Sequence, residues 1–99
     1  MKVNVDQVLK NMDGSSMKDV DVDGNAIDAT LKMAIVNALL APVERESGTD
    51  KMRKFNLSQK AYAGGEIAFD LDELKLIKDR VGDIFPPLVV GTVYQALGV

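Results

Sequence analysis

This chain of 99 residues is built around one apolar segment, Leu31-Lys-Met-Ala-Ile-Val-Asn-Ala-Leu-Leu-Ala41. Nine of these eleven residues are apolar, and the absence of glycine and proline leaves Ala, Leu and Met to favour a helix. The apolar residues run nearly all the way round that helix, which is typical of a central helix buried among others. Eleven residues are far fewer than the roughly 20 needed to cross a bilayer. We therefore predict a core helix over residues 30–41, capped by Asp28 or Thr30 and ended by Pro42.

A second helix is predicted over residues 50–63, because Thr49 can cap its start and two glycines, Gly64 and Gly65, can end it. The apolar residues of this helix keep one face, which consists of Met52, Phe55 and Tyr62, with Leu57 and Ala61 beside it. After the glycines, residues 66–69 are expected to cross the surface as a short strand.

Two further helices are predicted over residues 71–85 and 87–97. Asp70 and Glu73 match a capping box before the first of them, whose apolar residues then step by three or four along one face. These residues are Leu71, Leu74, Ile77, Val81, Ile84 and Phe85. Pro86 breaks this helix, and Pro87 suits the first turn of the next. The last helix is mostly apolar, so it either packs into the core of its own chain, which we favour, or contacts another subunit.

Residues 1–29 contain two competing patterns. Val3 and Val5 alternate with polar residues as in a strand, whereas the apolar residues from Val5 to Met12 follow helical spacing. The turn signal Asp13-Gly14 favours a short extended pair around it. A strand over residues 19–23 would bury its two valines, Val20 and Val22, and expose three aspartates.

The fold predicted from these patterns is mainly α, a small four-helix single domain. Residues 30–99 form its helical core, and residues 1–29 form a short irregular or β-hairpin-like N-terminal segment.

The composition removes several kinds of chemistry. The chain has no cysteine and no histidine, which excludes disulfides, thiolate nucleophiles, the usual general base and the usual zinc ligands. Two carboxylate pairs, Glu44 with Glu46 and Asp72 with Glu73, have no apolar surroundings in the sequence that would tune them for acid–base work. We therefore predict that the protein is not an enzyme and uses no cofactor or catalytic metal.

Charge is distributed unevenly along the chain. The formal net charge of −3 divides into −3 for residues 1–30, +3 for residues 31–63 and −3 for residues 64–99. Nucleic-acid binding needs a broad cationic face, so this layout argues against a nucleic-acid partner. It is compatible with self-association, in which the basic middle of one copy meets an acidic flank of another. Residues 1–6 are followed by no apolar signal-peptide region, so neither secretion nor a membrane partner is expected.

Four basic side chains make the second helix the clearest candidate for a binding site. They are Lys51, Arg53, Lys54 and Lys60, and they could bind an acidic protein surface or phosphate groups. The competing interpretation is that they form an ordinary solvated face of a surface helix.

A calcium site is a weaker hypothesis for residues 19–24. Asp19, Asp21, Asp23 and Gly24 match positions 1, 3, 5 and 6 of an EF-hand loop. Position 12 would be Thr30 instead of the bidentate glutamate, and no helix of adequate length precedes the loop. An acidic strand edge followed by a turn explains the same residues without a metal ion.

The chain as a whole resembles small proteins of unknown role encoded by tailed bacteriophages and prophages. The resemblance lies in Asn37-Ala-Leu-Leu-Ala41, in Lys54-Phe-Asn-Leu-Ser-Gln-Lys-Ala-Tyr62, and in Leu76-Ile-Lys-Asp-Arg-Val-Gly82 followed by Pro86-Pro-Leu-Val-Val-Gly91. These are packing and helix-end patterns without an active-site motif, so the resemblance implies an origin and a size class but no functional residue.

The leading functional hypothesis is a non-catalytic phage protein of the bacterial cytoplasm that binds a host or phage protein, as an inhibitor or modulator of a host factor or host defence. The alternative is a phage structural or assembly component that acts as a homo-oligomer through its apolar C-terminal helix. A third possibility is a small-ligand or Ca²⁺-binding module.

Overall fold

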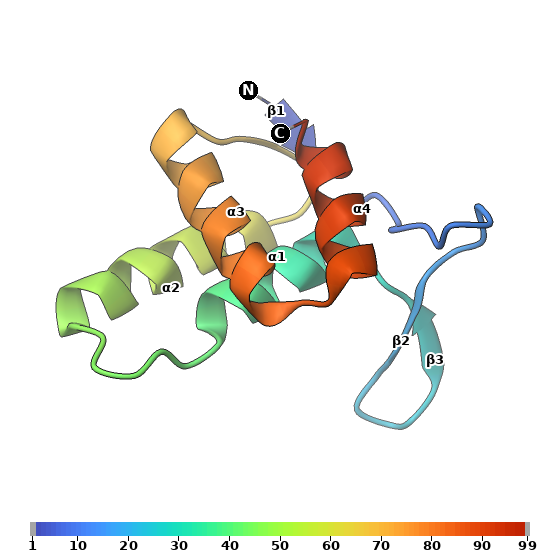
Figure 1. Ribbon diagram of the computed structural model, residues 1–99, viewed down its shortest axis with the longest axis horizontal. Helices are drawn as coiled ribbons and strands as arrows, with labels where there is room; N and C mark the ends of the chain where they lie inside the picture. The colour runs from blue at the N-terminus through green and yellow to red at the C-terminus, as the bar shows by residue number, and fades with distance from the viewer. Residues whose placement is uncertain (1, 99) are drawn as a thin grey trace.

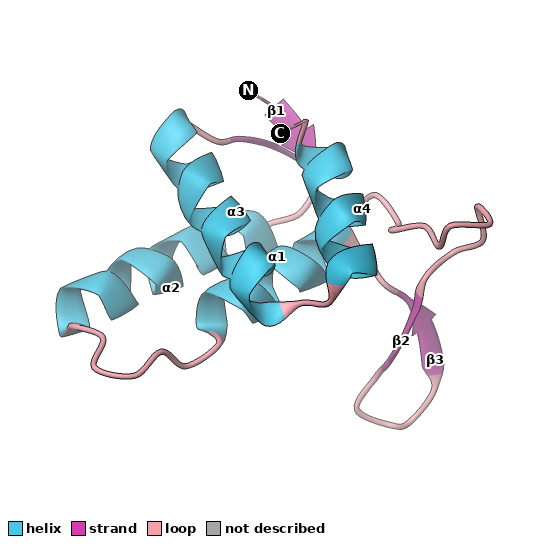
Figure 2. Cartoon of the chain, in the orientation of Figure 1, coloured by secondary structure: helices cyan, strands magenta, loops and turns pink. Residues whose placement is uncertain are grey.

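The computed structural model describes residues 2–98, which form four helices and four three-residue strands (Figure 1). The helices are α1 (Leu31–Leu40), α2 (Gly48–Tyr62), α3 (Leu71–Ile84) and α4 (Pro87–Leu97). The strands are β1 (Lys2–Asn4), β2 (Lys18–Val20), β3 (Ala26–Asp28) and β4 (Glu66–Ala68). Two small antiparallel sheets thus accompany the helices (Figure 2), which confirms the mainly helical architecture with a hairpin region.

Helix α1 is the central element, as its nearly continuous apolar character predicted. It packs against each of the other three helices, most extensively against α2. The Thr30 hydroxyl accepts the backbone N–H of Met33 at 3.3 Å, which selects Thr30 as the cap of this helix. The buried residues of α1 join a core whose largest members are Leu31, Ile35, Leu39, Phe69 and Ile77.

Helix α2 begins two residues earlier than predicted and buries a different face. Ser47, not Thr49, caps it by accepting the N–H of Asp50 at 3.1 Å. Of the expected apolar residues, Leu57 and Ala61 are buried, whereas Met52, Phe55 and Tyr62 are 54%, 44% and 67% exposed. The buried stripe of this helix consists instead of Lys54, Leu57, Ser58 and Ala61.

Two polar residues can occupy that stripe because their polar atoms have partners. Ser58 donates its hydroxyl to the backbone carbonyl of Lys54 at 2.8 Å, within the same helix. The Lys54 ammonium forms an ion pair with Glu46 from the preceding loop, and both side chains are only 10% exposed. Ser58 and Ala61 also have small side chains, which let α1 and α2 pack closely. The orientation of α2 therefore depends on this close packing and on the partners of its buried polar atoms more than on the hydrophobicity of its residues.

Helices α3 and α4 follow the predicted boundaries closely. Asp70 and Glu73 form the predicted capping box, with reciprocal hydrogen bonds of 2.8 and 2.9 Å. The apolar face of α3 is buried in its middle, whereas Leu71 at its start is 84% exposed. Helix α4 buries Val93 and Leu97 in the core of its own chain, so the preferred of the two expectations for this segment is confirmed.

The N-terminal segment contributes strands to two separate sheets. Strand β1 pairs with β4, and the Asp6 carboxylate accepts the N–H of Gly65 at 2.7 Å beside that sheet. The expected extended pair around Asp13-Gly14 is present as a short one: Lys10 and Ser16 form an antiparallel bridge, and backbone hydrogen bonds join Asn11 to Ser15 and Met17 to Leu9. The longer hairpin is instead β2–β3, which follows residue 17.

Strand β4 also differs from the expected surface strand, since Ile67 and Phe69 at this position are buried. The burial expected within residues 19–23 was wrong too: Val20 is 63% exposed and Val22 is fully exposed. The reason is visible in Figure 1, where the β2–β3 hairpin projects from the helical body and has no element packed over its tip.

Candidate functional site

An apolar groove lies between α1 and α2. We define this α1–α2 groove by its lining residues, which are Val36 and Leu40 from α1 and Phe55, Ser58, Gln59, Tyr62 and Ala63 from α2 and its end. The groove has a volume of about 420 Å³. None of its lining residues is charged, and its three largest side chains are about half exposed, which makes it an apolar surface that the described part of the chain leaves uncovered.

The groove follows from the sequences of the two helices. Helix α1 is apolar nearly all the way round, so any side without a neighbouring element remains apolar and exposed. Helix α2 carries a second stripe beside its buried one, formed by Met52, Phe55, Gln59 and Tyr62 at steps of three and four residues. Packing of α1 on the first stripe brings Val36 next to the second, and the two exposed edges together form the groove.

Two cations stand beside the groove. The Lys32 ammonium lies over the Tyr62 ring, 5.1 Å from its centroid, at one end. Lys51 lines an adjoining hollow together with Leu40 and Pro42, and with Glu46 and Lys54, which pair with each other and leave the Lys51 charge uncompensated there. The groove is therefore apolar at its floor and flanked by positive charge.

The structure does not bring the four predicted basic residues together. Lys54 is buried in its ion pair with Glu46, and the Lys60 ammonium contacts both carboxylate oxygens of Glu73 at 2.8 and 3.0 Å. Arg53 lies on the same side of α2 as Lys60, in a cleft lined also by acidic residues of α3. Spacing along the helix explains this separation. Arg53 and Lys60 are seven positions apart and therefore lie on the same side of α2, whereas Lys51 points to a different side. Of the four, Lys51 is the one that stands near the groove.

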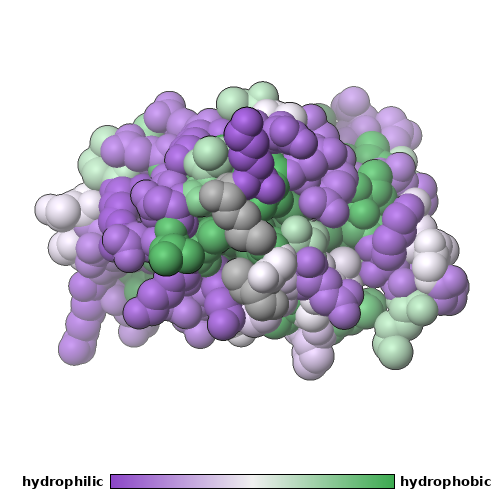
Figure 3. Space-filling view, turned by 90° about the horizontal axis from the view of Figure 1, so that it is seen from above, coloured by the Kyte–Doolittle hydropathy of each residue, from purple (hydrophilic) through white to green (hydrophobic). Residues whose placement is uncertain are grey.

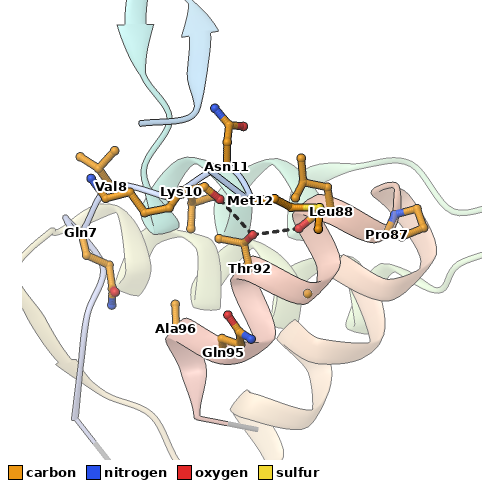
Figure 4. A pocket seen from close by; sticks show the side chains of 12 residues that line it. Gln7, Val8, Lys10, Asn11, Met12, Pro87, Leu88, Thr92, Gln95 and Ala96 are labelled. Carbon is orange, nitrogen blue, oxygen red and sulfur yellow. Dashed lines mark hydrogen bonds between the residues drawn. The ribbon is translucent and has the colours of Figure 1, made fainter. Parts of the chain in front are cut away.

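A larger hollow lies between residues 7–12 and α4 (Figure 4). Its volume is about 730 Å³, and a hydrogen bond from the Thr92 side chain of α4 connects its two walls. The Thr92 hydroxyl lies 2.9 Å from the carbonyl oxygen of Leu88 and 3.3 Å from that of Lys10, to either of which it can donate its proton. Its walls include the long side chain of Met12, which is 94% exposed, and carry no convergent charged groups. This hollow is consequently a less defined site than the α1–α2 groove.

The acidic residues are occupied in turns and caps. Hydrogen bonds from the Ser15 hydroxyl, at 2.6 Å, and from its backbone N–H hold the pKa of the Asp13 carboxyl below its ordinary value. The Asp21 carboxylate accepts the N–H groups of Asp23 and Asn25, each at 2.9 Å. Within residues 2–98 no three acidic side chains come together in a way that could hold a metal ion. Thr30, which would be position 12 of a calcium loop, caps α1 instead.

Sequence reasoning missed the α1–α2 groove, although the signal was present. An α1 that is apolar on nearly all sides and an α2 with apolar residues outside its buried stripe leave apolar surface uncovered between them. By contrast, the face seen from above is covered mainly by hydrophilic side chains, with hydrophobic ones visible only in small patches (Figure 3).

No protein-family model, curated protein or solved structure matches the chain. None of the helices within residues 2–98 combines the length and the apolar character that crossing a membrane requires.

Proposed function

We propose that this protein acts without catalysis, by binding a protein segment in the α1–α2 groove. The observation that supports the proposal is the uncovered apolar floor of the groove, which contains a tyrosine and a phenylalanine. Exposed apolar patches rimmed by polar residues are typical of interaction sites, and tyrosine is enriched among residues that dominate binding energies. The absence of histidine and cysteine from the sequence agrees with a role in binding.

The energetics of the groove indicate what kind of segment it would bind. Full burial of a large apolar side chain contributes about 1.5–3 kcal/mol. Covering the exposed parts of Leu40, Phe55 and Tyr62, each roughly half of the side chain, therefore contributes about 2–5 kcal/mol. Association itself costs at least about 4 kcal/mol, so apolar contact alone gives little net affinity. Carboxylates on the partner, placed against Lys32 and Lys51, supply the remaining attraction and the orientation.

The proposed partner segment is accordingly apolar and flanked by acidic residues. Its carrier, following the resemblance to phage proteins, is a host or phage protein in the bacterial cytoplasm. Among the four basic residues predicted from the sequence, Lys51 is the one expected to contribute directly. Lys54 and Lys60 are expected to stabilise the fold through their ion pairs.

The test is differential capture from a bacterial lysate. The bait proteins are the tagged wild type, a groove variant with Leu40→Glu and Tyr62→Glu, and the matched control Leu71→Glu, which places the same charge on an exposed leucine of α3. We expect the wild type and the control to retain the same protein and the groove variant to lose it. Lys51→Glu should weaken retention, and Arg53→Glu should not.

Circular dichroism establishes that every bait is folded. Retention that is equal for the groove variant and the wild type would contradict the proposal, as would a wild type that retains no protein and also stays monomeric.

A further inference from the structure

The β2–β3 hairpin, residues 18–28, is a second surface that nothing in the described chain covers. Its tip presents Val20 and Val22 to solvent. A two-stranded hairpin gains little stability by itself, yet this one is held in shape at both ends. Asp21 fixes the tip through its two hydrogen bonds to backbone N–H groups, and Lys18 pairs with Asp28 at 2.5 Å at the base. The hairpin is thus a preorganised projection that carries apolar side chains at its end.

The chemistry of the hairpin matches the segment that the α1–α2 groove is proposed to bind. Its two exposed valines alternate with Asp19, Asp21 and Asp23, and residues 18–28 contain four aspartates and one lysine. The groove offers an apolar floor between Lys32 and Lys51, in the part of the chain whose net charge is +3. Apolar groups therefore face apolar groups, and carboxylates face ammonium groups, when the two surfaces meet.

The two surfaces do not meet within one molecule. The hairpin projects away from the helical body (Figure 1), and Val20 and Val22 are exposed to solvent. We infer that the hairpin of one copy docks in the α1–α2 groove of a second copy, with Val20 and Val22 as its apolar anchors. This inference rests on the protein-binding role of the groove proposed above and names a second copy of the chain as the partner.

Such a contact joins two different surfaces, so each copy retains one hairpin and one groove for further neighbours. A head-to-tail contact of this kind builds a closed ring or an open filament and does not stop at a symmetric dimer. A hairpin tip covers less area than a standard protein interface, so each individual contact is weak and depends on protein concentration. Because opposite charges contribute, association should weaken as salt is added, whereas purely apolar association would not.

The decisive experiment uses two variants that block opposite surfaces. The hairpin variant carries Val20→Lys and Val22→Lys, and the groove variant carries Leu40→Glu and Tyr62→Glu. Sedimentation of the wild type should show a mass that rises with concentration and falls with salt. Each variant alone should remain monomeric, because both of its contacts with identical copies need the surface that is blocked. An equimolar mixture should give a one-to-one dimer and nothing larger, since one intact hairpin and one intact groove remain.

The control variants are Met12→Lys and Leu71→Glu, which each introduce one charge of the same sign at an exposed position outside both surfaces and should assemble like the wild type. A wild type that stays monomeric at millimolar concentration, a hairpin variant that assembles normally, or a mixture that fails to dimerise would each overturn the inference. Retention of a lysate protein by the hairpin variant but not by the groove variant would leave the proposed function standing and assign the groove to a different protein.

Discussion

A glycine in α3 offers a sharp test of how α3 and α4 pack. The Tyr94 hydroxyl of α4 donates to the carbonyl oxygen of Lys78 at 2.8 Å, next to Gly82. A Cβ atom added at Gly82 would lie 2.7 Å from that hydroxyl oxygen but 3.9 Å from the ring carbon Cζ, and no other atom comes as near. Alanine at this position therefore requires the Tyr94 hydroxyl to shift.

The expected stability changes follow from this geometry. Replacing a helical glycine by alanine gains about 1 kcal/mol of helix propensity. In the wild type, Gly82→Ala must displace the tyrosine, at a cost of about 1–3 kcal/mol for overpacking and about 0.5–1.5 kcal/mol for the lost hydrogen bond. We expect a net destabilisation of about 0.5–3.5 kcal/mol from these terms. With Tyr94→Phe already present, the same substitution meets no close atom and should stabilise the protein by about 1 kcal/mol.

The assay is urea unfolding of the four proteins of this double-mutant cycle, followed by circular dichroism. Gly91→Ala in α4 is the matched control, because its added Cβ would meet nothing within 4 Å. It should stabilise both backgrounds equally. The packing argument is refuted if Gly82→Ala stabilises the wild type as Gly91→Ala does, or if it destabilises the Tyr94→Phe protein by the same amount as the wild type.

Three other predictions concern single interactions. Ser47→Ala should lower the melting temperature by removing about 1 kcal/mol of capping energy from α2. Lys54→Met should cost about 3–5 kcal/mol in urea unfolding, because it leaves the Glu46 carboxylate buried and unpaired, and Glu46→Met added to it should recover most of that loss. Ser15→Ala should raise the pKa of Asp13, measured by NMR titration of its carboxyl group. Because the folded pKa of Asp13 is lowered, its stabilising contribution is present above the unfolded pKa and disappears as the pH falls through the folded pKa.

Each of these has an outcome that would contradict it. Thr49→Ala should change little, so a larger loss there than at Ser47 would move the cap to the position predicted from sequence. A double variant at Glu46 and Lys54 that is no more stable than Lys54→Met would mean that the pair is not coupled. An Asp13 pKa that is unchanged in Ser15→Ala would show that the hydroxyl hydrogen bond does not hold the carboxylate in solution.

The elements that sequence reasoning located correctly are those whose determinants are local. Propensity and the Thr30 cap are sufficient to place α1, and the Asp70–Glu73 capping box together with Pro86 places α3. The pairing of β1 with β4 joins residues more than 60 positions apart, and no short-range pattern specifies it. The same holds for the face of α2, because the burial of Lys54 depends on Glu46 in a loop whose path the sequence does not indicate.

From the sequence, the candidate site could be predicted only as more apolar surface than the fold would bury. Its position could not be predicted, because the groove exists where two helices meet. The basic residues of α2 were visible in the sequence, but their partners Glu46 and Glu73 come from other elements. In the folded chain, two of the four basic residues of α2 form ion pairs, Arg53 lines a cleft with acidic residues of α3, and Lys51 lies near the groove. A charge pattern in the sequence predicts which segments attract each other. It does not predict whether the charged residues pair within the folded chain or with another molecule.

Folding of the single chain does not account for its two exposed apolar surfaces. Val20 and Val22 pack on nothing in the described chain, and Leu40 and Tyr62 have more than half of their area in water, so replacing them by charged residues should cost the isolated fold little. A residue that contributes little to stability yet keeps apolar surface in solvent is explained more directly by a contact outside the chain. Because one surface is acidic and the other is flanked by lysines, a contact between copies would account for both surfaces at once.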